Sequence, residues 1–223
     1  MVQVKAVEAV KVKICGITRA EDAILALQLG AWALGFIFYE KSPRYIAPEK
    51  VKLLLADLQR RGLKPSHAVG VFVDADEKAI RETIRLSGID TVQLHGDEPA
   101  ELLEQLKDVR IFKAFRLRDK ADIAMIAKYE GAADAFLFDA AVAGAYGGTG
   151  QQSDWDLLAQ IHSRTPLIVS GGLKPDNALA AVQRLNPFAL DLSSGVESAP
   201  GIKDPEKLQQ LFKKLGEAHG DRT

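Results

Sequence analysis

The chain has 223 residues and a nearly balanced charge, with 29 Lys and Arg residues against 30 Asp and Glu residues. Hydrophobic residues make up 47% of the sequence, as in an ordinary globular domain with a substantial core. No basic run would attract nucleic acid, no apolar run reaches the ~18 residues of a membrane span, and residues 1–10 lack the apolar region of a signal peptide. We therefore expect a cytoplasmic protein without nucleic-acid or membrane partners that acts on a small molecule.

Short apolar runs typical of β-strands alternate with helical patterns eight times along the chain. The expected strands cover residues 11–16, 33–39, 68–74, 91–95, 111–116, 135–139, 166–170 and 189–193. The expected helices cover residues 21–29, 48–61, 76–87, 98–107, 119–130, 154–163, 175–185 and 204–216. Strict alternation of this kind predicts a parallel sheet.

Local signals mark the ends of these helices. Thr18 precedes Glu21 at the spacing of a capping box, and Asp74 could cap the helix that begins near Asp76. Prolines are expected in first turns at Pro48, Pro99, Pro175 and Pro205. Glycines that stop helices are expected at Gly30, Gly62, Gly88 and Gly131.

Two α/β folds repeat such units, the closed eightfold barrel and the open doubly wound sheet. A dinucleotide-binding open sheet would carry Gly-x-Gly-x-x-Gly after its first strand, where this chain reads Cys-Gly-Ile-Thr-Arg-Ala (15–20). The count of units therefore favours a single-domain (β/α)8 TIM barrel. We expect this barrel to span residues 11–218, between an N-terminal extension (1–10) and a C-terminal tail (219–223).

The single cysteine, Cys15, lies where the first strand opens into a loop. One thiol cannot form an internal disulfide or a four-cysteine metal site. In α/β enzymes the carboxyl ends of strands carry the chemistry, but a lone cysteine beside apolar residues is more often a core side chain. Residue type alone leaves both interpretations open.

Small residues follow the last two strands, at Gly171-Gly172 and Ser194-Gly195. Loops of this kind let backbone N–H groups approach an anion, and the end of strands seven and eight is the usual phosphate site of the barrel. A pair of glycines can also make a plain tight turn, but two such loops on adjacent strands favour a phosphate. The segment Gly147-Gly148-Thr149-Gly150 fits either a mobile lid or part of the same anion site.

Polar side chains end several other strands. Arg44 could bind a second anion such as a carboxylate, or be a solvated surface residue. Asp139 and Asp191 end apolar strands, where each carboxylate needs a partner or a role. Gln93 and His95 end the fourth strand, and His95 fits a structural role better than direct proton transfer. No spacing indicates a metal site or a serine nucleophile, so we expect neither metal nor cofactor.

Seven segments in register resemble the phosphoribosylanthranilate isomerase family. They are KVKICGIT (11–18), LGFIFYEKSPRYI (34–46), VGVFVD (69–74), VQLHGDE (92–98), LFDAAVAGAYGGTG (137–150) with Asp154-Trp155, IVSGGLKPDN (168–177) and LDLSSGVESAPGIKD (190–204). Each expected strand end but one carries such a segment, so the resemblance covers nearly the whole chain.

The resemblance implies an Amadori rearrangement of N-(5′-phosphoribosyl)anthranilate in tryptophan biosynthesis, without metal or cofactor. Asp139 would be the general acid and Cys15 the general base. Arg44 would bind the anthranilate carboxylate. The substrate's phosphate and its other polar groups would fall to Gly171, Gly172, Ser194, Gly195, Gln93, His95 and Asp191. The protein would be a monomer or a homodimer.

These roles make demands on the site. A free thiol titrates near ~8.5, so the site should lower the pKa of Cys15 or lose rate. Two departures from the family occur: Gln151-Gln152-Ser153 replaces a segment with Lys and Phe, and Ala140-Ala141 lacks polar residues. Alternative interpretations are a related phosphate-binding barrel, such as indole-glycerol-phosphate synthase or a sugar-phosphate epimerase, and a catalytically silent binding barrel.

Overall fold

Eight parallel strands form a closed barrel in the computed structural model of the chain, which describes residues 10–140 and 153–220. They pair in chain order, and β8 closes the barrel against β1. The strands are β1 (Lys11–Cys15), β2 (Ala33–Ile37), β3 (His67–Phe72), β4 (Thr91–Leu94), β5 (Arg110–Leu117), β6 (Ala135–Ala140), β7 (Leu167–Val169) and β8 (Ala189–Leu192). Each overlaps an expected strand, so the predicted (β/α)8 barrel is confirmed.

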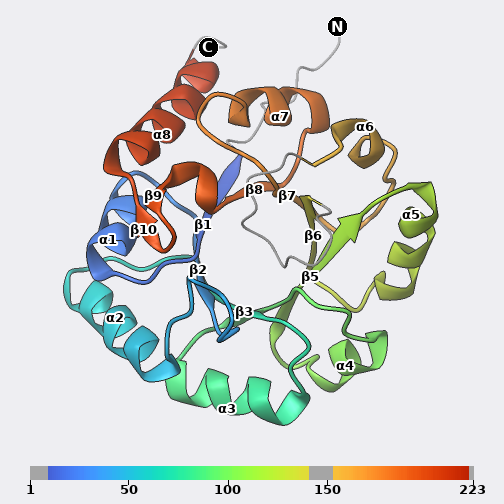
Figure 1. Ribbon diagram of the computed structural model, residues 1–223, viewed down its shortest axis with the longest axis horizontal. Coiled ribbons are helices and arrows are strands. Elements are labelled where there is room, and N and C mark those ends of the chain that lie inside the picture. Colours follow the sequence, from blue (N-terminus) through green and yellow to red (C-terminus); the bar gives the residue numbers. More distant parts are fainter. Residues whose placement is uncertain (1–9, 141–152, 221–223) are drawn as a thin grey trace, which may run out of the picture.

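An outer ring of α-helices surrounds the barrel, as Figure 1 shows with the strands at its centre. Within the described residues the helices are α1 (Ala20–Gln28), α2 (Pro48–Arg60), α3 (Glu77–Ser87), α4 (Ala100–Gln105), α5 (Lys120–Ile126), α6 (Trp155–Leu158), α7 (Ala178–Leu185) and α8 (Pro205–Gly220). Their buried faces and the outer face of the strands form one continuous apolar core. Among the described helices, none has the length and apolarity that a membrane span requires.

Two prolines predicted in first turns lie ahead of their helices instead. Pro99 precedes α4 because the carboxylate of Glu98 pairs with buried Lys113 at 2.8 Å and does not extend the helix. Pro175 precedes α7 because the side chain of Asn177 closes a turn around it. The Asn177 side-chain oxygen accepts a hydrogen bond at 2.8 Å from the backbone N–H of Lys174. Side-chain hydrogen bonds therefore set both helix starts.

Two predicted helix caps are wrong because the side chains bind elsewhere. The Thr18 hydroxyl donates to the carbonyl oxygen of Gly201 at 2.5 Å, so it forms no capping box with Glu21. Asp76, and not Asp74, caps α3, where its carboxylate accepts a backbone N–H at 2.7 Å. Asp74 accepts a hydrogen bond from the loop after β4 at 2.7 Å.

A short hairpin after β8 was not predicted. It consists of β9 (Glu197–Ala199) and β10 (Ile202–Lys203), and the 3₁₀ turn η2 (Ser194–Val196) precedes it. A second 3₁₀ turn, η1 (Ala127–Tyr129), follows α5. These strands are too short for a periodic pattern to reveal, and their pairing depends on the bend between them.

The barrel interior is a separate core, because side chains alternate between the two faces of each strand. Its apolar members are Ala33, Val69, Phe112, Ala114, Ala135, Leu137, Ile168 and Ala189. Polar residues that are register partners of these residues, or that lie two positions along the same strand, also face the interior. Lys13 is the register partner of Ala33, Gln93 is the register partner of Phe112, and Asp139 lies two residues after Leu137. The interior thus becomes polar toward one end.

Candidate active site

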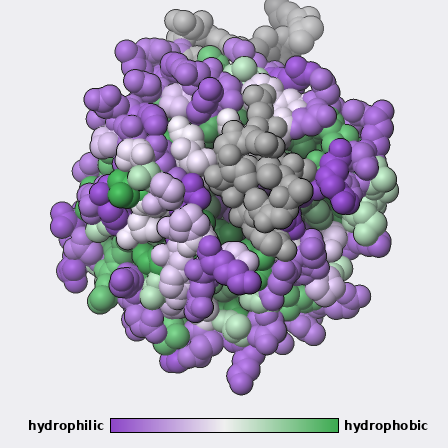
Figure 2. Space-filling view, viewed as in Figure 1, coloured by the Kyte–Doolittle hydropathy of each residue, from purple (hydrophilic) through white to green (hydrophobic). Residues whose placement is uncertain are grey.

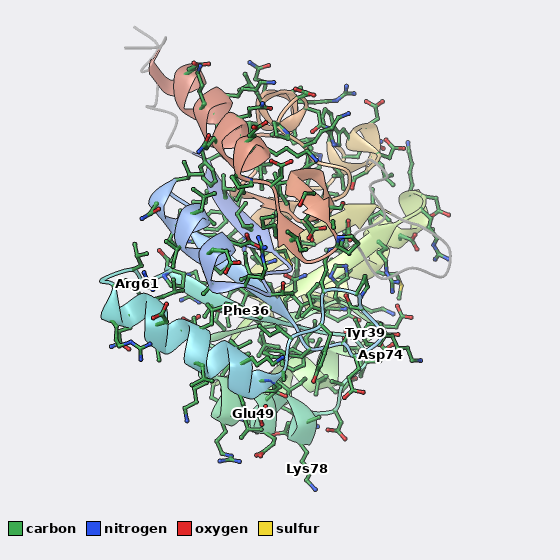
Figure 3. The ribbon with its side chains drawn as sticks, turned by 60° about the vertical axis from the view of Figure 1, so that its left-hand side comes forward. Phe36, Tyr39, Glu49, Arg61, Asp74 and Lys78 are labelled. Atoms are coloured by element: carbon green, nitrogen blue, oxygen red, sulfur yellow. The ribbon has the colours of Figure 1, made fainter. Side chains whose placement is uncertain are left out.

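The carboxyl ends of the parallel strands all lie at one end of the barrel, which we call the mouth. In Figure 3, Tyr39 and Asp74, from the loops after β2 and β3, are both drawn at this end of the barrel. Arg61, just past the end of α2, lies on the opposite side of the picture. On the face drawn in Figure 2, hydrophilic residues predominate and hydrophobic ones form small separate patches.

Cys15 ends β1 and is 6% exposed. Its register partner in β2 is Gly35, and the lack of a side chain there makes room for the thiol. A Cβ on Gly35 would lie 2.7 Å from the Cys15 sulfur. Burial raises the pKa of the thiol, and the charge of Asp191 adds to this, whereas Lys13 and Lys203 lower it. The expectation of a lowered pKa is therefore wrong for this structure, because desolvation outweighs the two ammonium groups.

Lys13 lies two residues before Cys15 and therefore faces the same interior. Its ammonium is fully buried and donates a hydrogen bond at 2.8 Å to Oδ1 of Asp191, its register partner in β8. Burial would lower the pKa of Lys13, but the charges of Asp191 and Cys15 turn the net shift upward. The predicted need of Asp191 for a partner is confirmed. The sequence did not mark Lys13 as a site residue, because Lys13 is simply a polar residue in the alternating pattern of the first strand.

Asp139 lies near the end of β6 and is 7% exposed. Nε2 of His95 lies 3.3 Å from Oδ2 of Asp139, within ion-pair distance for a charged imidazole. The other ring nitrogen, Nδ1, is 2.9 Å from the side-chain amide nitrogen of Gln93. β4 and β6 thus align an amide, an imidazole and a carboxyl group along the inner wall of the mouth.

Arg44 follows β2, and only 8% of it is exposed, so the interpretation as a solvated surface arginine is wrong. Its Nε lies 3.0 and 3.1 Å from the two carboxylate oxygens of Glu197, and its Nη2 donates to Oε2 at 2.8 Å. The guanidinium expected to bind a substrate carboxylate therefore already pairs with an internal one. Nη1 takes no part in these bonds.

A second buried lysine, Lys203 of β10, ties the hairpin to the strand that carries Cys15. Its Nζ donates to the carbonyl oxygen of Cys15 at 2.5 Å and to Oε1 of Glu197 at 2.7 Å. Burial would raise the pKa of Glu197, but Arg44 and Lys203 outweigh it and hold that pKa below its usual value. Burial lowers the pKa of Lys203 despite Glu197. Neither residue was a candidate from the sequence, because nothing local shows that these charges are buried.

The two small-residue loops predicted for phosphate touch each other. A Cβ on Gly195, after β8, would lie 1.9 Å from the carbonyl oxygen of Leu173, after β7, so only glycine fits there. Gly171 and Gly172 adopt φ of +85° and +62°, in the left-handed region that favours glycine. Ser194 begins η2 beside them. The loops thus form one continuous backbone surface at the mouth.

Several sequence features lie wholly or partly outside the described residues. They are the Gly147-Gly148-Thr149-Gly150 segment, Gln151-Gln152 and Ala141 from the two departures from the family pattern, residues 1–9 of the expected extension and residues 221–223 of the expected tail. Ser153, which follows Gln152, donates its hydroxyl to the carbonyl oxygen of Ser170 at 2.7 Å. This hydrogen bond attaches Ser153 to the residue that directly follows β7.

A cavity of about 790 Å³ lies beside the mouth, lined by the loop after β4, the end of β5 and α5. Arg116 and Arg118 lie on its wall, but Cys15 and Asp139 do not, so it is not where those two groups would meet a substrate. Within residues 10–140 and 153–220, no three His, Cys, Asp or Glu side chains gather as metal ligands.

A closed (β/α)8 barrel with a thiol and a carboxyl group on the inner wall of its mouth has the architecture of a TIM-barrel enzyme. Comparison with known proteins gives the particular family. Residues 12–214 match the family model described as N-(5′phosphoribosyl)anthranilate (PRA) isomerase. The chain belongs to this family.

Relatives and solved structures agree with this assignment. The N-(5′-phosphoribosyl)anthranilate isomerase of Geobacter metallireducens is 45% identical over 206 residues, which cover 92% of this chain and 98% of that one. The phosphoribosylanthranilate isomerase of Thermotoga maritima has a TM-score of 0.84 and 36% identity, with 93% and 99% of the two chains covered. A solved isomerase in complex with reduced 1-(o-carboxyphenylamino)-1-deoxyribulose 5-phosphate has a TM-score of 0.79 and 34% identity, with the same coverage. The resemblance seen in the sequence is confirmed.

Proposed function

We propose that this chain converts N-(5′-phosphoribosyl)anthranilate into 1-(2-carboxyphenylamino)-1-deoxyribulose 5-phosphate in tryptophan biosynthesis, with Asp139 as general acid and Cys15 as general base. The observation that carries the proposal is the position of these two groups, which both lie buried on the inner wall of one mouth in a chain of this family. An acid and a base on different strands can address two different atoms of a sugar between them.

The first step opens the furanose ring. Asp139 gives its proton to the ring oxygen while the C1′–O bond breaks, and the anthranilate nitrogen donates its lone pair to form an iminium ion. His95 lies beside the carboxyl group at 3.3 Å, where it can take part in holding the negative charge that the departing proton leaves. Gln93 fixes the imidazole ring from the other side at 2.9 Å.

The second step removes a proton from C2′. The Cys15 thiolate takes this proton, and the electron pair moves into the iminium to give an enolamine, which tautomerises to the ketone. Because the iminium nitrogen accepts the electrons, this chemistry needs no metal ion or pyridoxal. The burial that raises the thiol pKa also makes the thiolate, once formed, a stronger base.

The two anionic ends of the substrate would bind to different groups at the mouth. Arg44, which follows β2, does not lie on the far side of the barrel from the loop after β8, because it pairs with Glu197 of that region. The touching loops of Gly171-Gly172 and Ser194-Gly195 offer backbone N–H groups to the phosphate. Arg44 would contact the anthranilate carboxylate through the N–H donors that Glu197 does not take, two on Nη1 and one on Nη2.

The test uses the fluorescence of the anthranilate group. Adding the protein to freshly prepared phosphoribosylanthranilate should quench this fluorescence without added metal. Cys15→Ser and Asp139→Asn should each lower kcat by about two to four orders of magnitude, with KM changed little. Turnover close to the wild-type value in either variant would refute that residue's role, and no quenching by the wild-type protein would refute the function.

A further inference from the structure

We propose that Lys13 is a positioning residue for this reaction: its buried ammonium stabilises the Cys15 thiolate against the opposing charge of Asp191, the carboxylate with which it pairs. The inference rests on the proposed function, because it assumes that Cys15 acts as a thiolate. It gives Lys13 a role beyond that of one partner in an internal ion pair. Asp191 then acts on the Cys15 thiol and not on the substrate.

The geometry follows from the closure of the barrel. Lys13 and Cys15 are two residues apart on β1, so their side chains leave the strand on the same inner side. Asp191 is the register partner of Lys13 on β8, and its Oδ1 lies 2.8 Å from the lysine Nζ. Lys13 is fully buried and Asp191 is 5% exposed, so water screens neither charge.

The ammonium can serve two partners at once. It carries three N–H donors, and Asp191 Oδ1 takes one of them. The charge of Lys13 also acts on the Cys15 thiol, two residues along the same inner side of β1, and favours its thiolate form. The ammonium therefore pairs with Asp191 and keeps donors for a thiolate on the same inner side of β1.

The charges around Cys15 act in opposite directions. They are Lys13 on β1, Asp191 on β8 and Lys203 on β10, while the facing residue on β2 is the uncharged Gly35. The two lysines favour the thiolate, and Asp191 opposes it. Removing Lys13 and removing Asp191 should therefore move the titration of Cys15 in opposite directions.

The experiment follows thiolate formation directly by ultraviolet absorbance across a pH series. The chain has one cysteine, so subtracting the spectrum of Cys15→Ser leaves the signal of Cys15 alone. Lys13→Met should raise the titration midpoint by about one to three pH units, because a buried carboxylate then faces the thiol without its counter-charge. Asp191→Asn should lower the midpoint. Lys13→Arg keeps the charge and should titrate close to the wild-type midpoint.

Lys113→Met is the matched control. Lys113 is also a buried lysine, paired with Glu98 at 2.8 Å, but it lies on β5 and faces away from the barrel interior. Its loss should lower the melting temperature and leave the Cys15 midpoint unchanged. In steady-state assays at neutral pH, Lys13→Met should lower kcat with little change in KM.

An unchanged midpoint in folded Lys13→Met, or shifts in the same direction in Lys13→Met and Asp191→Asn, would overturn the inference. If Lys13→Met does not fold, the Cys15 midpoint in Asp191→Asn provides the test. A downward shift would support the inference, and no downward shift would overturn it. The absorbance titration requires no substrate. Failure of the wild-type protein to isomerise the substrate would therefore refute the proposed function separately.

Discussion

Replacing Gly35 with alanine would place a methyl group against the Cys15 thiol. The new Cβ would lie 2.7 Å from the sulfur, 3.0 Å from Cα and 3.2 Å from Cβ of Cys15. Relaxed carbon contacts lie near ~3.5–4.0 Å, so β1 and β2 would have to move apart by up to about 1 Å. Overpacking of this kind costs about 1–3 kcal/mol, and a misplacement of about 1 Å can lower turnover about 100-fold.

Thermal unfolding and the fluorescence assay measure the two effects separately. For a chain of this size, each kcal/mol lost lowers the melting temperature by about 2–4 °C. Gly70→Ala is the matched control, because its Cβ would lie 2.3 Å from Cδ1 of Ile89 and 2.8 Å from Phe38, in the outer core. We expect it to lose stability but to keep its turnover wherever it is folded.

A double mutant tests the cause of the strain. In a Cys15→Ala background the contact at 2.7 Å is absent, so Gly35→Ala should cost less stability than it does when the sulfur is present. Two results would refute the reasoning: wild-type turnover in Gly35→Ala, or the same loss of stability with and without the sulfur.

Two further predictions concern the network around the mouth. The pKa of Glu197 is depressed in the folded protein, so its pairing stabilises the fold above the usual carboxyl pKa of about 4.3 and is lost as pH falls through the lowered value. Urea unfolding at a series of acidic pH values should show a steeper loss in the wild-type protein than in Glu197→Gln, and equal slopes would count against this pairing. Gln93→Leu removes the group that fixes His95, so we expect kcat to fall about tenfold in steady-state assays. A change in melting temperature alone would limit Gln93 to a structural role.

The mouth buries several charged side chains around one thiol. Lys13 pairs with Asp191, and Glu197 lies between Arg44 and Lys203. Buried pairs of this kind add little to stability over apolar packing, because desolvation offsets their attraction. Their arrangement beside Cys15 therefore fits a role in the proton transfers that we propose better than a role in holding the barrel together.

Some predictions failed at the ends of elements, and the reason is the same in each case. Thr18 has the spacing of a helix cap but bonds to Gly201, and Glu98 has the position of a first-turn residue but pairs with Lys113. In both cases a partner distant in the sequence competes with the local one. Spacing along the chain cannot show which partner wins.

The sequence alone determined the barrel and the approximate positions of its strands, because strand and helix periods and the βα alternation are local properties. It also placed Cys15 and Asp139 at strand ends and, through its motifs, indicated the family. Only the tertiary structure decided which charges meet. Lys13 and Asp191 are 178 residues apart, and Arg44 and Glu197 are 153 apart. Closing β8 against β1 and folding the hairpin beside them brings these groups into contact, and their burial then sets the electrostatics around Cys15.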